Sequence, residues 1–247
     1  MDLGIADKVA LVCGSSAGLG LACAEELARE GASVVLVGRD GERLRAAAER
    51  VGEIAGALPR TVRADVATPE GRASILAACP APDILINNAG GPPRKDFREL
   101  TVDDWRASMD ANFIASVEMI RETVDQMIGK RWGRIVNITS LTARMPVEKM
   151  DMSTSARLAL AGYVAGVSRQ IAESGVTINN LLPGTFATER LKAVGQTGDQ
   201  LGKQVPMRRA GDPREFGAIC AFLCSVHAGY VTGQNWLADG GLVPVTI

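Results

Sequence analysis

The stretch Cys13-Gly-Ser-Ser-Ala-Gly-Leu-Gly20 joins the apolar run VALVC (9–13) to the pattern GLGLACAEELAREG (18–31). The run has the length and composition of a buried strand, and the pattern has the periodicity of an amphipathic helix. The turn between them carries glycines in a G-x3-G-x-G spacing, namely Gly14, Gly18 and Gly20. Glycines at such a turn let the backbone approach a pyrophosphate at the positive end of the helix. The alternative is that they only allow close packing of the helix on the strand.

The alternation of strands and helices continues along the chain. Further apolar strand patterns cover 33–38, 61–66, 83–90, 133–140, 176–184 and 235–241, and helical patterns cover 42–56, 69–79, 101–130, 155–175 and 213–225. Continuous apolar strands separated by helices predict a parallel sheet covered on both faces. We therefore expect one doubly wound α/β domain over residues 1–247, with about seven strands and a ligand beyond their carboxyl ends. Thr101 is expected to cap the longest helix.

Charge and composition exclude several classes of protein. The formal net charge of −1 offers no electrostatic footprint for nucleic acid or for an anionic membrane. No apolar run approaches the roughly 20 residues that span a bilayer, and the N-terminus does not resemble a secretory signal. We expect a cytoplasmic protein with reduced thiols.

Cys220, Cys224 and His227 have a spacing that could supply three metal ligands. The surrounding sequence AICAFLCSVHAG is typical of a buried apolar helix face. Core packing is therefore the favoured interpretation, and no metal site is predicted.

The second strand ends at Gly38 and is followed by Arg39 and Asp40. This is the position where an acidic residue binds the adenosine 2′-hydroxyl of NAD(H), or where an arginine pairs with the 2′-phosphate of NADP(H). A planar guanidinium suits a phosphate. The order of the two residues favours NADP(H), while Asp40, interpreted as a loop or helix-cap residue, keeps NAD(H) possible.

Four further motifs accompany the glycine turn: Asp65-Val66, Asn87-Asn88-Ala89-Gly90, Pro183-Gly184 and Asp239-Gly240-Gly241. With these motifs the whole chain resembles the short-chain dehydrogenase/reductase (SDR) family. The resemblance implies a single-domain Rossmann fold, an NAD(P)(H)-dependent oxidoreductase activity on a carbonyl or alcohol substrate, and a homotetramer or homodimer. It also implies a set of cofactor-binding residues: Gly14, Ser15, Ser16, Gly18, Leu19, Gly20, Arg39, Asp65, Val66, Asn88, Ala89, Gly90, Arg157, Pro183, Gly184 and Thr188.

The family's catalytic residues are an asparagine, a serine, a tyrosine and a lysine. The resemblance places the asparagine at Asn112 and the serine at Ser140. The tyrosine should follow that serine by thirteen positions, and the lysine should follow the tyrosine by four. These positions hold Ser153 and Arg157. A branch of the family similar to 3-oxoacyl-acyl-carrier-protein reductases shows a comparable Ser-x3-Arg, and its members are named oxidoreductases.

The two replacements change the chemistry of the site. A tyrosine phenol has an ordinary pKa of about 10, which nearby positive charge lowers, whereas an aliphatic hydroxyl is a much weaker acid. Arg157 can donate hydrogen bonds to ribose hydroxyls, but it stays protonated and does not shuttle a proton. No other tyrosine is well placed, since Tyr163 lies about 15 Å further along the same helix and Tyr230 lies near the last strand.

Three interpretations of Ser153 and Arg157 follow. In the first, the chain is an oxidoreductase that protonates its substrate through a water held by Ser140, Ser153 and Arg157. In the second, it binds the nucleotide but has lost the chemistry and serves as a regulatory or partner subunit. In the third, Ser153 only caps a helix and Arg157 is a solvated surface charge. The substrate is not identified, and residues 185–206 are the expected position of a mobile substrate lid.

Overall fold

The computed structural model describes residues 1–189 and 202–244. Within these residues, seven parallel strands form one sheet in the order β3-β2-β1-β4-β5-β6-β7. The order reverses between β1 and β4, so the switch point of the sheet lies at the carboxyl ends of these strands. The predicted doubly wound α/β fold is confirmed. The strands are β1 (Val9–Val12), β2 (Ser33–Gly38), β3 (Arg60–Arg63), β4 (Ile84–Asn87), β5 (Gly133–Ile138), β6 (Val176–Pro183) and β7 (Asn235–Ala238).

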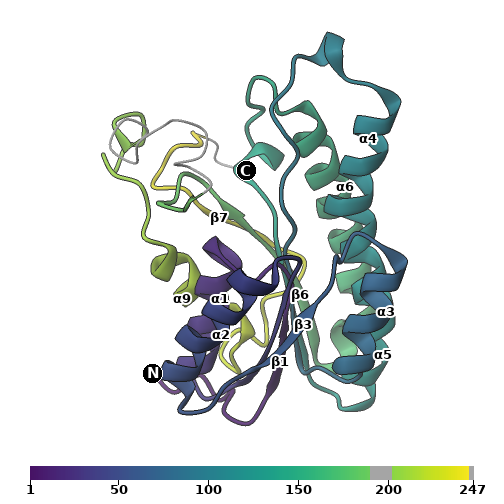
Figure 1. Ribbon diagram of the computed structural model, residues 1–247, viewed down its shortest axis with the longest axis vertical. Helices are drawn as coiled ribbons and strands as arrows, with labels where there is room; N and C mark the ends of the chain where they lie inside the picture. The colour runs from purple at the N-terminus through teal and green to yellow at the C-terminus, as the bar shows by residue number, and fades with distance from the viewer. Residues whose placement is uncertain (190–201, 245–247) are drawn as a thin grey trace.

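Helices cover both faces of the sheet (Figure 1). One face packs on α1 (Gly18–Arg29), α2 (Gly41–Ala55) and α9 (Pro213–Cys224). The other packs on α3 (Pro69–Ala78), α5 (Ala115–Gly129) and α6 (Asp151–Ile171), and α4 (Val102–Met109) lies against α6. Alternate residues of β2 enter the two cores, because successive side chains of a strand point to opposite faces. In the described part of the chain, no helix is both long and apolar enough to span a bilayer.

The structure corrects the predictions for two helices. The segment predicted as one helix over 101–130 has a π-helical turn, η2 (Asp110–Ile114), between α4 and α5. Helix α6 runs from Asp151 to Ile171, whereas the predicted range is 155–175. The N-cap at Thr101 is confirmed, with a full capping box. Short 3₁₀ turns complete the fold: η1 (Phe97–Glu99), η3 (Leu141–Ala143) and η4 (Ala172–Ser174).

Most of the predicted lid lies outside the described residues. The prediction covers 185–206, and the structure describes only 185–189 and 202–206 of that range. The prediction of a lid therefore stays untested.

A ladder of four asparagines crosses the sheet near its carboxyl edge, and we call it the amide ladder: Asn87, Asn137, Asn180 and Asn235. The four residues are paired in register on β4, β5, β6 and β7. Each side-chain Nδ2 donates to the Oδ1 of the next asparagine, at 2.9, 3.0 and 2.8 Å. Asn87, Asn137 and Asn180 are buried. The Oδ1 atoms of Asn137, Asn180 and Asn235 each accept a hydrogen bond, whereas the buried Oδ1 of Asn87 accepts none within the described residues. Buried hydrogen-bond networks of this kind make the packing of a core more specific.

Replacing Asn235 with Ala is expected to lower the free energy of unfolding by about 1 kcal/mol, because the Nδ2 of Asn180 loses its acceptor. Urea unfolding followed by circular dichroism measures this difference. Gln234→Ala is the matched control, since Gln234 is an exposed neighbour outside the ladder. Equal losses in the two variants would show that the ladder adds no stability at this edge.

Candidate active site

The glycine turn is built as the sequence predicts. Gly14 has a φ of +58° and Gly18 a φ of +60°, a backbone region that favours glycine. A Cβ at Gly14 would lie 2.7 Å from the Nδ2 of Asn88, and a Cβ at Gly20 would overlap the carbonyl oxygen of Gly14. Asn88 in turn donates from Nδ2 to that carbonyl oxygen at 3.0 Å. The turn after β1 is therefore locked to the turn after β4 by contacts that only glycine permits.

The start of α1 is suited to an anion. Its N-cap residue, Ala17, makes no capping hydrogen bond, and its first turn holds no acidic residue. Helices α2, α3, α4 and α9 all have side-chain caps, from Asp40, Thr68, Thr101 and Asp212. The amide groups at the start of α1 thus keep their donors and their positive dipole for a ligand. These residues fit the pyrophosphate of a dinucleotide.

The two serines of the turn have different environments. Ser15 is fully buried, and its hydroxyl donates to the carbonyl oxygen of Val12 while accepting from the amide of Val37. Its side chain joins β1 to β2, so any contact of Ser15 with a cofactor would come from its backbone. Ser16, in the turn after β1, lies against the last residue of β2. A Cβ on Gly38 would come within 3.1 Å of its Oγ. Leu19 packs against the core beneath α1.

The residues predicted to surround the adenosine lie together at the ends of β2, β3 and β4. The guanidinium of Arg39 is 3.6 Å from the carboxylate of Asp65, and its Nη2 faces Gly90. Asp40 caps α2 by accepting from the amides of Glu42 and Arg43, as its helix-cap interpretation predicts. These backbone hydrogen bonds, that of Arg43 first, lower the pKa of the Asp40 carboxyl. Val66 lies next to Asp65 and packs against the core.

The segment after β6 lies close to the start of α1. A Cβ at Gly18 would be 3.8 Å from the methyl group of Thr188, so Thr188 lies over the start of α1. Gly184 packs closely on Asp239, which fixes the Pro183-Gly184 turn against the end of β7. Thr188 and the turn after β4, with Ala89 and Gly90, thus belong to the same edge of the sheet as the glycine turn.

Two of the four predicted catalytic residues, Asn112 and Arg157, meet where the π-helical turn passes the end of β5. Asn112 lies in that turn, and its Nδ2 donates to the carbonyl oxygen of Ser108 at 3.1 Å. Arg157 donates from Nη2 to the Oδ1 of Asn112 at 2.9 Å and from Nη1 to the carbonyl oxygen of Ile138 at 2.6 Å. A guanidinium thus links α6, η2 and the carboxyl end of β5. π-Helical turns are frequent at functional sites.

The structure excludes one interpretation of the Ser-x3-Arg pair. Ser153 lies within the first turn of α6, whose N-cap is Met150, so Ser153 does not cap the helix. Arg157 is only 6% exposed, so it is not a solvated surface charge. Ser153 is also buried, and Ser140 uses its Oγ to accept from the amide of Thr142. Catalytic and nucleotide-binding interpretations of the pair therefore remain.

The side chains considered as replacements for the tyrosine are engaged elsewhere or exposed. Tyr163 packs edge-on against Phe113, and burial raises its pKa. Tyr230 is fully exposed. The Nε2 of His227 lies 2.7 Å from the carbonyl oxygen of Asp2, so this histidine ties down the N-terminal segment.

The cysteines of α9 are buried in the core, as predicted. Cys220 and Cys224 are inaccessible and belong to the same apolar core as Cys23 of α1. Burial raises the pKa of the Cys224 thiol well above its ordinary value, so the thiol stays protonated.

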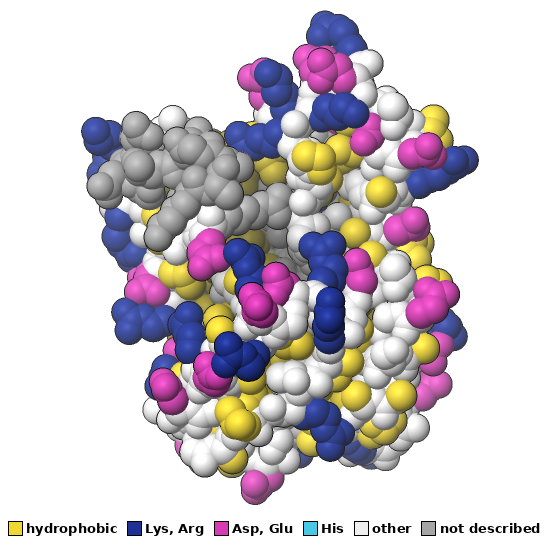
Figure 2. Space-filling model, in the orientation of Figure 1, with side chains coloured by type: hydrophobic (Ala, Val, Ile, Leu, Met, Phe, Trp, Pro, Cys, Tyr) yellow, Lys and Arg dark blue, Asp and Glu magenta, His cyan; other side chains and the backbone are white. Residues whose placement is uncertain are grey.

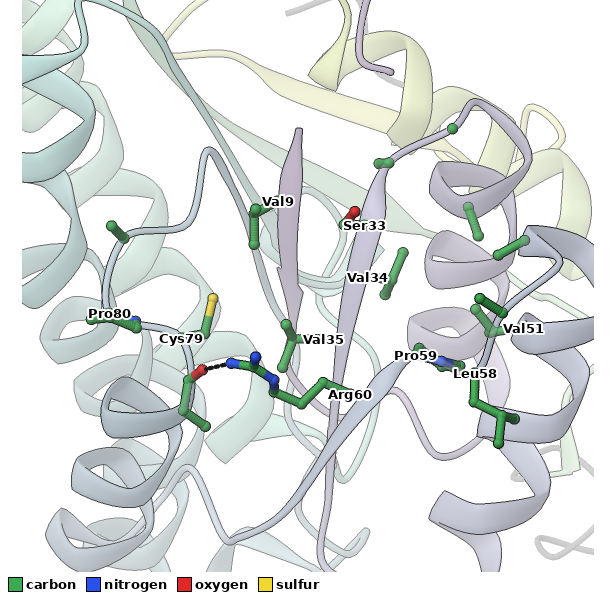
Figure 3. A pocket seen from close by; sticks show the side chains of 17 residues that line it. Val9, Ser33, Val34, Val35, Val51, Leu58, Pro59, Arg60, Cys79 and Pro80 are labelled. Atoms are coloured by element: carbon green, nitrogen blue, oxygen red, sulfur yellow. Dashed lines mark hydrogen bonds between the residues drawn. The ribbon is translucent and has the colours of Figure 1, made fainter. Parts of the chain in front are cut away.

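A cavity of about 530 Å³ lies at the opposite, amino end of the sheet. It is lined by the starts of β1, β2 and β3 and by the residues that follow α3, and it contains none of the predicted site residues. Figure 3 shows Arg60 reaching from β3 towards Cys79 and Pro80, where it donates to the carbonyl oxygen of Ala78. The wall is mainly apolar, and this cavity takes no part in the site at the carboxyl ends.

Comparison with known proteins agrees with the fold and the motifs. A family model described as enoyl-(acyl carrier protein) reductase matches residues 14–243. The chain belongs to the short-chain dehydrogenase/reductase family. The prediction of an SDR-type oxidoreductase is thereby confirmed at the level of the family.

Relatives of this SDR chain carry several activities in their names. It is 32% identical to a 3-oxoacyl-[acyl-carrier-protein] reductase FabG of Aquifex aeolicus over 98% of this chain and 100% of the relative. It is 36% identical to a gluconate 5-dehydrogenase of Gluconobacter oxydans over 94% of this chain and 93% of the relative. Its structure resembles that of an L-sorbose reductase of Gluconobacter frateurii complexed with NADPH and L-sorbose. The TM-score is 0.90 and the identity is 32%, and the match covers 99% of this chain and 100% of the reductase.

Proposed function

We propose that this chain is an NADP(H)-dependent SDR oxidoreductase that interconverts a carbonyl and an alcohol without a catalytic tyrosine. A 3-oxoacyl thioester or a similar ketone is the proposed substrate class, supported by the reductases among the relatives. The single observation that carries the proposal is the hydrogen-bonded link from Arg157 to Asn112 and Ile138. A buried guanidinium held in this way supplies positive charge at the position where the family has its lysine.

The roles of the residues follow from this geometry. The start of α1 and the glycine turn hold the nucleotide, whose nicotinamide supplies the hydride when bound. The hydroxyls of Ser140 and Ser153 bind the carbonyl oxygen of the substrate. Arg157 stabilises negative charge that develops on this oxygen, because electrostatic stabilisation by a preorganised group is strong in a buried site. A water molecule held by Ser140, Ser153 and Arg157 delivers the proton, since the guanidinium does not release one.

A nucleotide-binding pseudoenzyme that acts as a regulatory or partner subunit is the second candidate. It is favoured by the burial of Ser153 and Arg157, which are 4% and 6% exposed. Fluorescence titration with NADPH and NADH, followed by turnover on ketones, β-ketoacyl thioesters and alcohols, separates the two functions. The enzyme should bind NADPH and oxidise it above background with at least one substrate. Tight nucleotide binding with no turnover across a broad panel of substrates would support the pseudoenzyme. If neither NADPH nor NADH bound, both candidate functions would be contradicted.

Replacing Arg39 with Ala is expected to raise the Kd of NADPH about tenfold or more and that of NADH less than about twofold. Arg39 lies at the end of β2 beside Asp65, where a 2′-phosphate is recognised in this fold. Fluorescence titration measures both constants. Arg45→Ala, on the exposed side of α2, is the control. Equal losses for the two nucleotides would argue against recognition of the 2′-phosphate by Arg39.

The proposal includes a homotetramer in the cytoplasm. Exposed apolar side chains support self-association: Trp236 on β7, and Val226 and Tyr230 after α9 are all accessible. Light scattering coupled to size-exclusion chromatography distinguishes a tetramer from a dimer or a monomer.

A further inference from the structure

Three arginines lie around the start of α2, and the structure gives them different partners. Arg39 and Arg43 follow β2, and Arg63 ends β3, directly opposite Gly38 in the register of the two strands. All three are exposed. Figure 2 shows basic and acidic side chains interspersed over this face of the molecule. The positive charge that each arginine offers to a ligand therefore depends on whether a carboxylate lies next to it.

Two of the three arginines already face a carboxylate. Arg39 lies 3.6 Å from Asp65, and Arg43 lies 3.3 Å from Glu189. An incoming phosphate must compete with these carboxylates. Exposed ion pairs are weak, so the competition is possible, but it reduces what each arginine adds.

Arg63 forms no ion pair with any carboxylate in the described part of the chain. Its Nε donates to the carbonyl oxygen of Arg39 at 3.2 Å, which fixes the guanidinium beside the turn after β2. A Cβ at Gly41 would lie 3.7 Å from the Cδ of Arg63, so the aliphatic part of the Arg63 side chain lies against the first residue of α2. The two terminal nitrogens are thus held next to the residues that follow β2.

Arg63 also acts on the negative charge of Asp40. The carboxylate of Asp40 caps α2 and adds negative charge where a 2′-phosphate would approach. Its pKa is lowered first by the backbone amide of Arg43, and the charges of Arg43 and Arg63 lower it further. Arg63 therefore offsets a charge that would otherwise repel a phosphate.

We propose that Arg63 is a second 2′-phosphate-binding residue, and that it sets the preference for NADP(H) together with Arg39. This inference rests on the proposed cofactor and assigns a residue to it. A phosphate monoester carries roughly −1.5 to −2 charges near pH 7, and guanidinium groups bind it with charge-assisted, often bidentate, hydrogen bonds. Two guanidinium groups from neighbouring strands suit such a group better than one that is already paired.

The test uses nucleotide fragments, so it needs no turnover. Isothermal titration measures the Kd of 2′,5′-ADP and of 5′-ADP, which differ only in the 2′-phosphate, on the wild-type chain and on Arg63→Ala. We expect Arg63→Ala to raise the Kd of 2′,5′-ADP about tenfold and that of 5′-ADP less than about twofold. Arg63→Lys should recover part of the loss, because it keeps the charge. Arg45→Ala should change neither constant, and thermal unfolding checks that the variants fold.

The outcomes separate this inference from the proposed function. Equal losses for the two fragments in Arg63→Ala would show that Arg63 only supports the turn, and would overturn the inference. Unchanged constants in Arg63→Ala, with a wild-type preference for 2′,5′-ADP, would overturn it while leaving the NADP(H) preference in place. A wild-type chain that binds the two fragments equally would overturn both.

Discussion

Combining Ser153→Tyr with Arg157→Lys is expected to raise NADPH-dependent carbonyl reduction by about 10²-fold or more, the usual contribution of general acid catalysis. The two positions keep the family's spacing on α6 and lie in its first two turns. A phenol beside an ammonium group releases its proton far more readily than a serine hydroxyl does. A lysine at 157 also retains donors for the carbonyl oxygen of Ile138 and the Oδ1 of Asn112. Steady-state oxidation of NADPH with a β-ketoacyl thioester measures the gain.

The single variants are the controls for this prediction. Arg157→Lys alone should give no gain, because it adds no acid that can reach the substrate. Ser153→Tyr alone should give a smaller gain, since the arginine lowers the phenol pKa but does not relay a proton. No gain in the double variant, at unchanged NADPH affinity and melting temperature, would show that the pocket has been rebuilt for a different purpose.

Replacing Gly20 with Ala is expected to raise the Kd of NADPH about 100-fold. A Cβ at this position would overlap the carbonyl oxygen of Gly14 and lie 2.7 Å from the Nδ2 of Asn88. Both atoms belong to the turns that we propose bind the nucleotide, and a backbone oxygen cannot rotate away as a long side chain can. The turn must therefore open, which moves the amide groups at the start of α1. Fluorescence titration with NADPH measures the loss.

Gly162 of α6 provides the matched control for this glycine. A Cβ at Gly162 would meet no atom within 4 Å. Gly162→Ala should leave the Kd of NADPH unchanged and raise the free energy of unfolding by about 0.5–1 kcal/mol, through the helix propensity of alanine. Wild-type affinity in Gly20→Ala would contradict the assigned role of the turn.

The sequence predicts the strands, most helices and the glycine turn after β1 because their signals are local. The apolar runs, the glycine spacing and the capping box at Thr101 are each contained in a few consecutive residues. The start of α6 has no such signal, since Met150 offers no capping side chain, and the prediction placed it too late. The π-helical turn at Asn112 also escapes prediction, because one inserted residue hardly changes the apolar periodicity of a long helix.

Features that depend on pairing between distant strands are not visible in the sequence. The asparagines of the amide ladder come from four strands, and only the register of the sheet aligns them. The burial of Ser15 depends on β2, which supplies the amide of Val37. Likewise, Arg63 gains its significance from the ion pairs of Arg39 and Arg43, which the sequence alone does not reveal.

Transfer of deuterium from NADPH labelled at nicotinamide C4 tests the central claim most directly. The wild-type chain is incubated with labelled NADPH, made in both C4 stereochemistries, and with the panel of ketones and β-ketoacyl thioesters. Mass spectrometry then measures deuterium in the alcohol products. An oxidoreductase without the tyrosine should place deuterium on the former carbonyl carbon of at least one substrate, from one of the two labelled forms. NADPH that binds tightly but transfers no deuterium to any substrate would contradict the enzyme and support the nucleotide-binding pseudoenzyme.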